Sequence, residues 1–218
     1  MPSKTLKPRR MIVGILLAAG SAMRFGGNKL LAELGDGRCI AEVSCAKLRP
    51  AVDRLIAVVR PDAIELSARL AAAGAEICVF ADAKNGMGAS IAHGVMQARH
   101  AAAWLIALAD MPLVAGDDVL SVAEALRAGA GIALPVASGK RGHPVGLSRQ
   151  FFAELAALSG DTGAREILAR FTTEIVEVPV GDVRSLHDVD TEFDLKVARQ
   201  LFIGLSTSSP VKTPSTST

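Results

Sequence analysis

The sequence predicts one α/β domain in which a mostly parallel, doubly wound sheet lies between two layers of helices. One observation is that short apolar runs alternate with longer amphipathic segments, as they do in right-handed strand–helix–strand units. A second is that 50% of the residues are hydrophobic but only 4% are aromatic, which favours helices on a buried parallel sheet over an aromatic-rich sandwich. The length of 218 residues suits one such domain.

Each expected element is an apolar or amphipathic run bounded by turn residues. The expected strands cover residues 13–17, 54–59, 76–80, 104–109, 131–136 and 174–178. The expected helices cover residues 40–48, 62–73, 89–101, 117–128, 151–158, 164–170 and 191–201. The domain is therefore expected to span residues 11–203. A basic tail (residues 1–10) and a Ser/Thr/Pro-rich tail (residues 204–218) are expected to be disordered, because they have too little apolar content to order themselves.

The charge distribution argues against a nucleic-acid partner. The net charge is +2, but four of the 24 basic residues lie in the leading tail, which leaves 20 basic against 22 acidic residues in the remainder. Binding to DNA or RNA needs a basic surface, often interleaved with aromatic side chains, and the body of this chain has neither. No membrane partner is expected either.

The cysteine pattern favours a cytoplasmic protein. Cys39, Cys45 and Cys78 are odd in number, lack the C-x-x-C spacing of a zinc site, and lie in apolar or helical surroundings. Reduced, buried thiols are therefore expected, and such thiols are typical of the cytosol.

The first expected strand lies within an apolar run, residues 11–19, that follows basic residues and precedes small ones. A secretory signal peptide has the same order of features. We favour a retained strand, because the next ten residues carry a phosphate-binding pattern that makes sense only above an intact strand.

A loop of small residues follows this strand and carries two permanent positive charges. It reads L-A-A-G-S-A-M-R-F-G-G-N-K over residues 17–29. Small residues let backbone N–H groups approach phosphate oxygens closely, and Arg24 and Lys29 favour negative charge there. Two common glycine motifs do not fit, because Ala22 and Met23 occupy glycine positions of G-x-G-x-x-G, and Leu30 stands where a P-loop needs Ser or Thr.

The pattern L-A-A-G-x-x-x-R-F-G-x-x-K resembles the signature of the MobA-like nucleotidyltransferase family, and the resemblance extends from the first expected strand to the last expected helix. It implies a Rossmann-like, three-layer αβα fold whose first loop wraps the triphosphate of an incoming nucleotide. The alternative is a glycine-rich turn with two solvated basic residues. The implied nucleotide-binding residues of this loop are Leu17, Ala18, Ala19, Gly20, Arg24 and Lys29.

Two carboxylates are candidate magnesium ligands. Asp110 ends an apolar run before Met-Pro, a strand tip that suits Mg²⁺ held by few protein ligands and by substrate phosphates. The resemblance implies the metal role for this A-D-M-P position. Later, D-V-D-T-E-F-D-L is similar to the family's D-x-D-T-P-E-D-L, departing at Glu192 and Phe193, and implies that Asp190 is a second ligand. Alternatively, Asp110 caps a turn, and Asp190 or Thr191 caps the last helix.

Glycine-rich segments supply the remaining candidates. Residues 85–90, N-G-M-G-A-S, are similar to a family stretch around the base and ribose, although by residue type alone they form a helix cap. Residues 139–144, G-K-R-G-H-P, and 160–165, G-D-T-G-A-R, are similar to stretches of the cytidylyltransferase branch and imply contacts to an acceptor's phosphate and pterin. The alternatives are a histidine bonded to backbone and a solvated basic turn. The candidates are Asn85, Gly88 and Ser90 for the nucleotide, and Lys140, Arg141, His143 and Arg165 for the acceptor.

The resemblance implies an Mg²⁺-dependent nucleotidyltransferase with Arg24, Lys29 and Asp110 as catalytic residues. Ala18-Ala19 before Gly20 is similar to the branch that uses CTP, the molybdenum cofactor cytidylyltransferases, whereas the GTP branch has Ala-Gly-Gly there. The expected reaction transfers CMP from CTP to the terminal phosphate of molybdopterin, and the product would serve an apo-molybdoenzyme of the xanthine dehydrogenase type. The alternatives are a GTP-using guanylyltransferase, a sugar-1-phosphate nucleotidyltransferase, a non-catalytic cofactor-delivery factor and an NAD-dependent oxidoreductase.

Overall fold

A mixed sheet forms the centre of the computed structural model, which describes residues 10–20, 28–181 and 187–207, with side chains as far as Phe202. The strand order is β3-β2-β1-β4-β7-β5-β6, and β8 pairs with the other side of β5. All pairings are parallel except those of β6 and β7. The strands are β1 (Ile12–Leu17), β2 (Arg54–Val59), β3 (Glu76–Val79), β4 (Ala103–Leu108), β5 (Ile132–Ala137), β6 (Lys140–Arg141), β7 (Val145–Ser148) and β8 (Ile175–Pro179).

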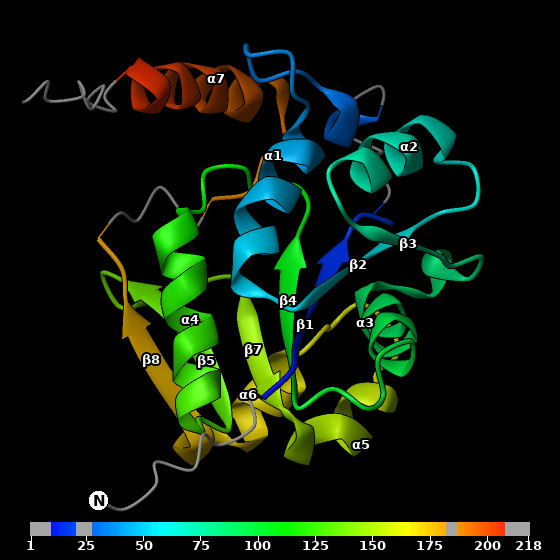
Figure 1. Ribbon diagram of the computed structural model, residues 1–218, viewed down its shortest axis with the longest axis vertical. Helices are drawn as coiled ribbons and strands as arrows, with labels where there is room; N and C mark the ends of the chain where they lie inside the picture. The colour runs from blue at the N-terminus through cyan, green and yellow to red at the C-terminus, as the bar shows by residue number, and fades with distance from the viewer. Residues whose placement is uncertain (1–9, 21–27, 182–186, 208–218) are drawn as a thin grey trace, which may run out of the picture.

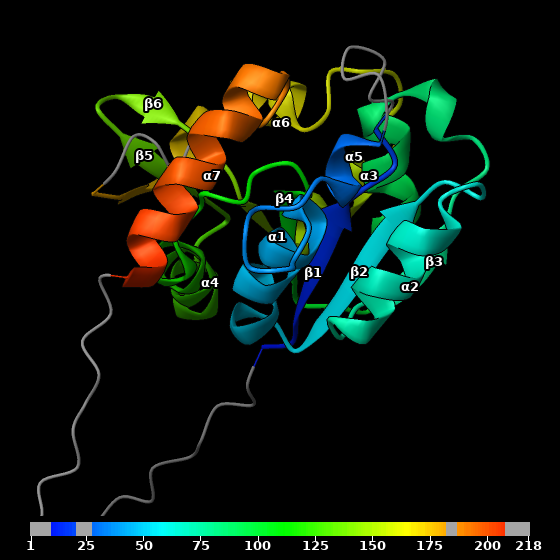
Figure 2. The same cartoon turned by 90° about the horizontal axis from the view of Figure 1, so that it is seen from above.

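Helices cover both faces of the sheet, which confirms the expected three-layer class. In Figures 1 and 2, α1, α2 and α4 lie on one face, α3, α5 and α6 lie on the other, and α7 crosses above the carboxyl ends of the parallel strands. The α-helices are α1 (Ile40–Leu48), α2 (Ile64–Ala72), α3 (Met87–Met96), α4 (Gly116–Ala128), α5 (Phe152–Ala156), α6 (Arg165–Arg170) and α7 (Glu192–Thr207). Short 3₁₀ turns are η1 (Lys29–Leu31), η2 (Arg49–Ala51), η3 (Ala83–Asn85), η4 (Arg149–Phe151) and η5 (Thr172–Glu174).

The side chains on the two faces of β1 belong to two separate apolar clusters, because successive side chains of a strand point to opposite sides. Ile12 and Leu16 are buried in the cluster under α1 and α4. Val13 and Ile15 are buried in the cluster under α3, together with Trp104. β1 pairs with β2 on one side and with β4 on the other, so the apolar run at residues 11–19 forms the central strand of the parallel part.

Neither antiparallel strand, β6 or β7, was expected from the sequence, and β7 is the longer of the two. It lies between β4 and β5 and pairs antiparallel with both. Its four residues are too few to show the alternation of apolar and polar side chains that predicts a strand, and two of them are the small residues Gly146 and Ser148. A Cβ at Gly146 would lie 2.6 Å from the side chain of Leu126 on α4, so a larger residue would force that side chain to shift.

Helix α7 continues to Thr207, beyond the end at residue 201 that the periodicity predicted. Leu195, Ala198 and Phe202 are buried against the same cluster as α1. The Arg199 guanidinium donates to the backbone oxygen of Glu33 (2.7 Å), and Arg38 lies over the ring of Phe202, 5.5 Å from its centroid. These contacts join α7 to the segment that follows Lys29.

None of the helices described is both long enough and apolar enough to cross a lipid bilayer.

Candidate active site

The carboxyl ends of β1 and β4 bring the first loop and Asp110 to the same edge of the sheet. The backbone N–H of Ala109 donates to the Leu17 oxygen (3.1 Å), and that of Ala18 donates to the Val58 oxygen on β2 (2.9 Å). Ala18 and Ala19 are buried, and Gly20 is exposed at the point where the chain leaves the sheet. In doubly wound sheets this edge is where ligands bind.

Lys29 joins the two carboxylates that the sequence singles out. Its ammonium lies 2.9 Å from Oδ2 of Asp110 and 2.8 Å from Oδ1 of Asp190, although these residues are 80 positions apart. The Lys29 and Asp110 side chains are 14% and 22% exposed, whereas that of Asp190 is 50% exposed. Burial alone would lower the pKa of the Lys29 ammonium, but the hydrogen bonds and negative charges of both carboxylates raise the pKa above its ordinary 10.5. The ammonium therefore keeps its charge.

Asp190 does not cap α7, because its neighbours do so. Oδ2 of Asp194 accepts from the backbone N–H of Thr191 (2.8 Å) and from its hydroxyl (2.7 Å), and the Thr191 hydroxyl accepts from the Asp194 N–H (3.1 Å). This reciprocal pair satisfies the helix start in the manner of a capping box. The carboxylate of Asp190 is thus left to face Lys29.

Val189, which lies between Asp188 and Asp190, connects the segment before α7 to the end of β4. The backbone N–H of Val189 donates to the Asp110 oxygen (2.9 Å), and the Val189 side chain is 2% exposed. Partial burial raises the pKa of the Asp188 carboxyl, and the negative charges of Asp190 and Asp110 raise it further. The charge of Lys29 acts on Asp188 in the opposite direction, so Asp188 lies within electrostatic range of the pair formed by Asp110 and Asp190.

Asp110 also carries an oxygen suited to a further cation. Its Oδ1 is buried and has no hydrogen-bond partner among the described residues. A buried carboxylate oxygen without a partner is costly, and a divalent ion would remove that cost. The described residues contain no cluster of three or more His, Cys, Asp or Glu side chains placed to hold a metal. Magnesium commonly takes only one or two protein carboxylates plus substrate phosphates, so the pair fits such an ion.

His143, one of the acceptor candidates, lies within electrostatic range of Asp110 and Asp188, and Arg165, another, lies within range of His143. Burial lowers the pKa of the His143 imidazole, and the positive charge of Arg165 also lowers it. A hydrogen bond to the backbone of Ile106 and the negative charge of Asp110 raise this pKa, but by less. Nδ1 of His143 is buried and has no partner within the described part of the chain. Arg165 is exposed. The imidazole of His143 thus lies within electrostatic range of both Asp110 and the Arg165 guanidinium.

The other two acceptor candidates, Lys140 and Arg141, form β6 and are exposed. The Arg141 guanidinium donates two bonds to Oε1 of Glu177 on β8, at 2.9 and 2.8 Å. Its charge is therefore already engaged in a surface ion pair, which leaves Lys140 as the more available cation of this hairpin.

The nucleotide candidates at residues 85–90 pack backbone to backbone against the acceptor segment at residues 159–163. Gly86 has a φ of 104°, and the Gly88 N–H donates to the Gly160 oxygen (2.7 Å). A Cβ at Gly88 would lie 2.6 Å from the Ser159 oxygen, so only glycine allows this approach. Asn85 is exposed, whereas Ser90 is buried and its hydroxyl donates back to the Gly86 oxygen (3.2 Å).

Some predicted residues cannot be placed and some polar residues were not predicted. Arg24, with the rest of residues 21–27, lies outside the described residues. Sequence reasoning named Thr191 as a possible cap but not its partner Asp194, and it did not select Ser44 and Lys47, which contact the turn that carries Asp110. The T-x-x-D spacing could have identified the cap.

Comparisons with known proteins identify the family of this chain and structures of similar fold. A family model described as "MobA-like NTP transferase domain" matches residues 14–176. No curated protein sequence matches the chain. The crystal structure of Rv0371c from Mycobacterium tuberculosis is 27% identical, with a TM-score of 0.76 over 87% of this chain and 98% of that one. The same protein in complex with manganese is 28% identical, with a TM-score of 0.71 and the same coverage. Molybdopterin-guanine dinucleotide biosynthesis protein A from Archaeoglobus fulgidus is 23% identical, with a TM-score of 0.62 over 89% and 100% of the two chains, and shows likeness of fold.

Proposed function

Because the chain belongs to the MobA-like NTP transferase family, we propose that it is a nucleotidyltransferase that moves CMP from CTP to the terminal phosphate of molybdopterin. The products would be molybdopterin cytosine dinucleotide and pyrophosphate. The observation that carries the proposal is the convergence of Lys29, Asp110 and Asp190 at the carboxyl ends of β1 and β4, beside the first loop. The choice of CTP rests on Ala18-Ala19, and the choice of acceptor rests on the segments around His143 and Arg165.

The first loop and the α3 start would hold the nucleotide. We propose that Leu17, Ala18, Ala19 and Gly20 present backbone groups to the triphosphate, with Arg24 and Lys29 as its cationic partners. Asn85, Gly88 and Ser90 would lie on the base and ribose side. Since the Ser90 hydroxyl is bonded to its own helix, its contribution there would be to shape the turn.

Asp110 and Asp190 would hold a magnesium ion. Their fit rests on the unpartnered Oδ1 of Asp110 and on the way both carboxylates already surround a cation. When bound, such an ion neutralises phosphate charge as it develops on the leaving group. A divalent ion is also supported by the manganese complex of the Mycobacterium tuberculosis relative.

In the proposed reaction, an oxygen of the acceptor's terminal phosphate attacks the α-phosphorus of CTP in line. The bond from the α-phosphorus to the bridging oxygen breaks, and pyrophosphate leaves with the electron pair. A phosphate monoester has a second pKa of about 6, so it is already largely ionised at neutral pH and needs no general base. Lys29 and Arg24 would stabilise the leaving pyrophosphate, and Lys140, Arg141, His143 and Arg165 would hold the acceptor.

We further propose that the protein acts in the cytoplasm and that it supplies the dinucleotide cofactor to an apo-molybdoenzyme of the xanthine dehydrogenase type. The cytoplasmic location is supported by the three free, buried cysteines.

Pyrophosphate release is the direct test. The purified chain is incubated with Mg²⁺, molybdopterin and one of CTP, GTP, UTP or ATP, and both pyrophosphate and the dinucleotide product are measured. Selective release with CTP is the expected result. Preference for GTP would make the protein a guanylyltransferase, and release only with sugar 1-phosphates would change the acceptor class. No release with any acceptor would support a cofactor-delivery factor instead.

A further inference from the structure

Helix α1 donates two side-chain hydrogen bonds to the turn that carries Asp110. The Ser44 hydroxyl lies 3.0 Å from the Ala109 oxygen and 3.1 Å from the Ile40 oxygen of its own helix. The Lys47 ammonium donates to the Pro112 oxygen at 2.6 Å. These two carbonyl groups flank Asp110 and Met111, so α1 holds the turn on both sides of the carboxylate.

The carbonyl of Asp110 itself is held from a different part of the chain. It accepts the backbone N–H of Val189, the residue before Asp190. Within the stretch 109–112, three carbonyl groups are therefore fixed by α1 and by the segment that brings the second acidic residue.

The side chains of Ser44 and Lys47 lie in partly or fully buried surroundings, where removing a polar group from water costs free energy. Ser44 is 6% exposed and is one of two residues in the described chain that are classed as buried and polar. Burial and, to a smaller extent, the positive charge of Arg38 together lower the pKa of the Lys47 ammonium to about 8. An apolar side chain at either position would avoid this desolvation cost. The hydrogen bonds that Ser44 and Lys47 donate to the turn offset it.

The cavity that these two groups line within the described part of the chain is too small for a substrate. The cavity beside them has a volume of about 20 Å³ and is also lined by Met111 and His143. A single water needs about 10–15 Å³ measured in this way, so no nucleotide or acceptor could enter. Their partners are the carbonyl groups of the turn.

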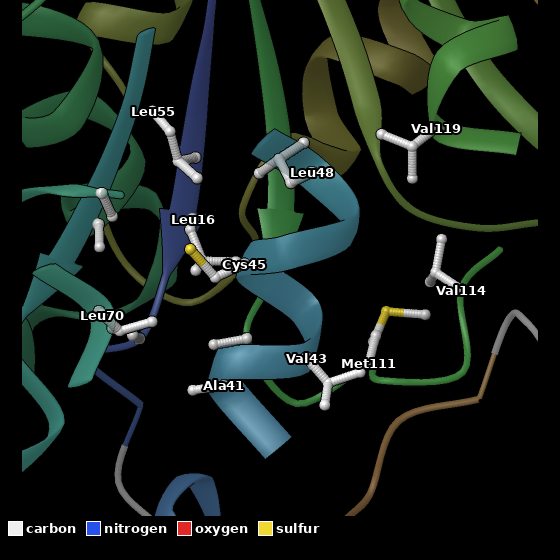
Figure 3. Packing of buried hydrophobic residues seen from close by; sticks show 14 of the residues in the cluster. Leu16, Ala41, Val43, Cys45, Leu48, Leu55, Leu70, Met111, Val114 and Val119 are labelled. Atoms are coloured by element: carbon white, nitrogen blue, oxygen red, sulfur yellow. The ribbon is translucent and has the colours of Figure 1, made fainter. Parts of the chain in front are cut away.

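Helix α1 is a rigid base for these bonds. Ile40, Ala41, Val43, Cys45 and Leu48 are all buried. Figure 3 shows Ala41, Val43, Cys45 and Leu48 along the helix, with Met111 and Val114 of the Asp110 loop on the side that carries Val43. Movement of the turn relative to the sheet would thus have to disturb a packed core as well as the two bonds.

We propose that Ser44 and Lys47 are positioning residues, which hold the backbone around Asp110 so that its carboxylate is fixed for a divalent cation. The inference rests on the proposed function insofar as it takes Asp110 as a metal ligand. Groups that orient a metal ligand through its surroundings typically contribute about 10- to 100-fold to metal affinity or activity.

Mn²⁺ binding to the full chain tests this inference with four variants. Ser44→Ala and Lys47→Met each remove one bond to the turn. Ser67→Ala is the matched control for the first, because the Ser67 hydroxyl donates locally, to the oxygen of Ala63 at the start of α2 (2.7 Å). Arg127→Met is the matched control for the second, because Arg127 also donates from a helix to a backbone oxygen, that of Ala51, which precedes β2 (2.8 Å).

The expected result is that Ser44→Ala and Lys47→Met each weaken Mn²⁺ binding about 10-fold and lower kcat with little change in the nucleotide KM. The two controls should bind Mn²⁺ as the parent chain does. Amide hydrogen exchange should also become faster at Val189 and within residues 109–114 in the two test variants only. Equal Mn²⁺ affinity in test and control variants, or unchanged exchange at Val189, would overturn the inference.

The same measurements separate this inference from the proposed function. If the parent chain binds no Mn²⁺, the metal role of Asp110 is wrong, and hydrogen exchange alone decides whether Ser44 and Lys47 hold the turn. If Mn²⁺ binds and responds to the variants but no pyrophosphate is released, the positioning role stands and the proposed reaction fails.

Discussion

At the scale of single residues, Asp110 has one oxygen bonded to Lys29 and one that is buried without a partner in the described chain. We expect Asp110→Asn to reduce kcat by more than about 100-fold, because the amide lacks the charge that a divalent ion requires. The melting temperature should change little, since the side chain lies at a strand tip and not in the core. Pyrophosphate release and thermal unfolding measure the two effects.

A matched control for this change is Glu124→Gln, which removes one exposed carboxylate from α4. It should leave turnover unaltered. Activity of the Asp110 variant within a few-fold of the parent would rule out the proposed metal ligand.

Lys29 contacts both of the proposed metal ligands, so its ammonium and a divalent ion should compete for their negative charge. Removal of the ammonium by Lys29→Met should strengthen Mn²⁺ binding in the absence of nucleotide by roughly 10-fold, because a like charge no longer contacts both ligands. Turnover should nevertheless fall, since the triphosphate loses a cationic partner.

Titration of nucleotide-free protein with Mn²⁺ measures the first effect. Lys196→Met, which removes an exposed cation from α7, should show the parent affinity. Weaker Mn²⁺ binding in the Lys29 variant would mean that the ammonium organises the carboxylates and does not compete with the metal.

The buried Lys47 predicts a pH dependence of stability. Its pKa is about 8 in the folded protein, whereas the unfolded chain keeps the ordinary value of 10.5, so between these values the unfolded chain binds more protons than the folded one. The free energy of unfolding then rises with pH in that window. Full conversion of the shift would overstate the effect for a group that is not wholly buried, and we expect about 1–2 kcal/mol.

Denaturant unfolding at pH 7.5 and pH 10 of the parent and of Lys47→Met tests this sign. The thiols titrate in both proteins and cancel in the comparison. The parent should gain stability relative to the variant at the higher pH, and parallel pH profiles would contradict the assigned pKa.

At the scale of elements, the start of α7 decides where Asp190 points. Thr191→Ala removes the hydroxyl that accepts from the Asp194 N–H and donates to its carboxylate, and should cost about 1 kcal/mol of stability. For a chain of this size that corresponds to a fall of about 2–4 °C in melting temperature. Mn²⁺ affinity should fall as well, because Asp190 is the adjacent residue.

Thr191→Ser keeps the hydroxyl and should restore both properties. If Thr191→Ala melted at a lower temperature but bound Mn²⁺ with the parent affinity, the cap would stabilise the fold without affecting the position of Asp190.

The elements also show which parts of the fold the sequence can predict. The bounds of β2 and α1 coincide with the predicted residues 54–59 and 40–48, since each is a strongly patterned run between clear turn signals. The antiparallel β7 was missed because four residues carry little periodicity and because its place between β4 and β5 is set by long-range pairing.

Some residues of the candidate site can likewise be predicted from the sequence, and others cannot. Lys29 and Asp110 are recognisable from local motifs, and the structure brings their side chains together. The sequence left Asp190 as either a cap or a ligand, because both roles suit an acidic residue before a helix. The Thr191–Asp194 pair at the start of α7 excludes the cap, and the metal role remains a proposal. Ser44 and Lys47 look like ordinary residues of an amphipathic helix, since their partners lie 65 positions away.

At the scale of the whole molecule, the proposed site joins segments that are far apart in sequence. The strand tips of β1 and β4, the turn at Lys29 and the start of α7 meet at one edge, and Figure 2 shows α7 crossing that edge. A ligand that bridges these segments stabilises the entire fold, because it binds the folded chain and not the unfolded one.

We therefore expect CTP with Mg²⁺ to raise the melting temperature selectively among the four nucleoside triphosphates. At a ligand concentration of about 100 times Kd the gain is about 2.7 kcal/mol, which for a chain of this length corresponds to roughly 5–10 °C. CTP without Mg²⁺ should give a smaller shift, and Asp110→Asn should remove the difference between the two conditions, because the ion then lacks its main protein ligand. An equal shift with all four nucleotides would show that the triphosphate alone is recognised, and the assignment to CTP would be wrong.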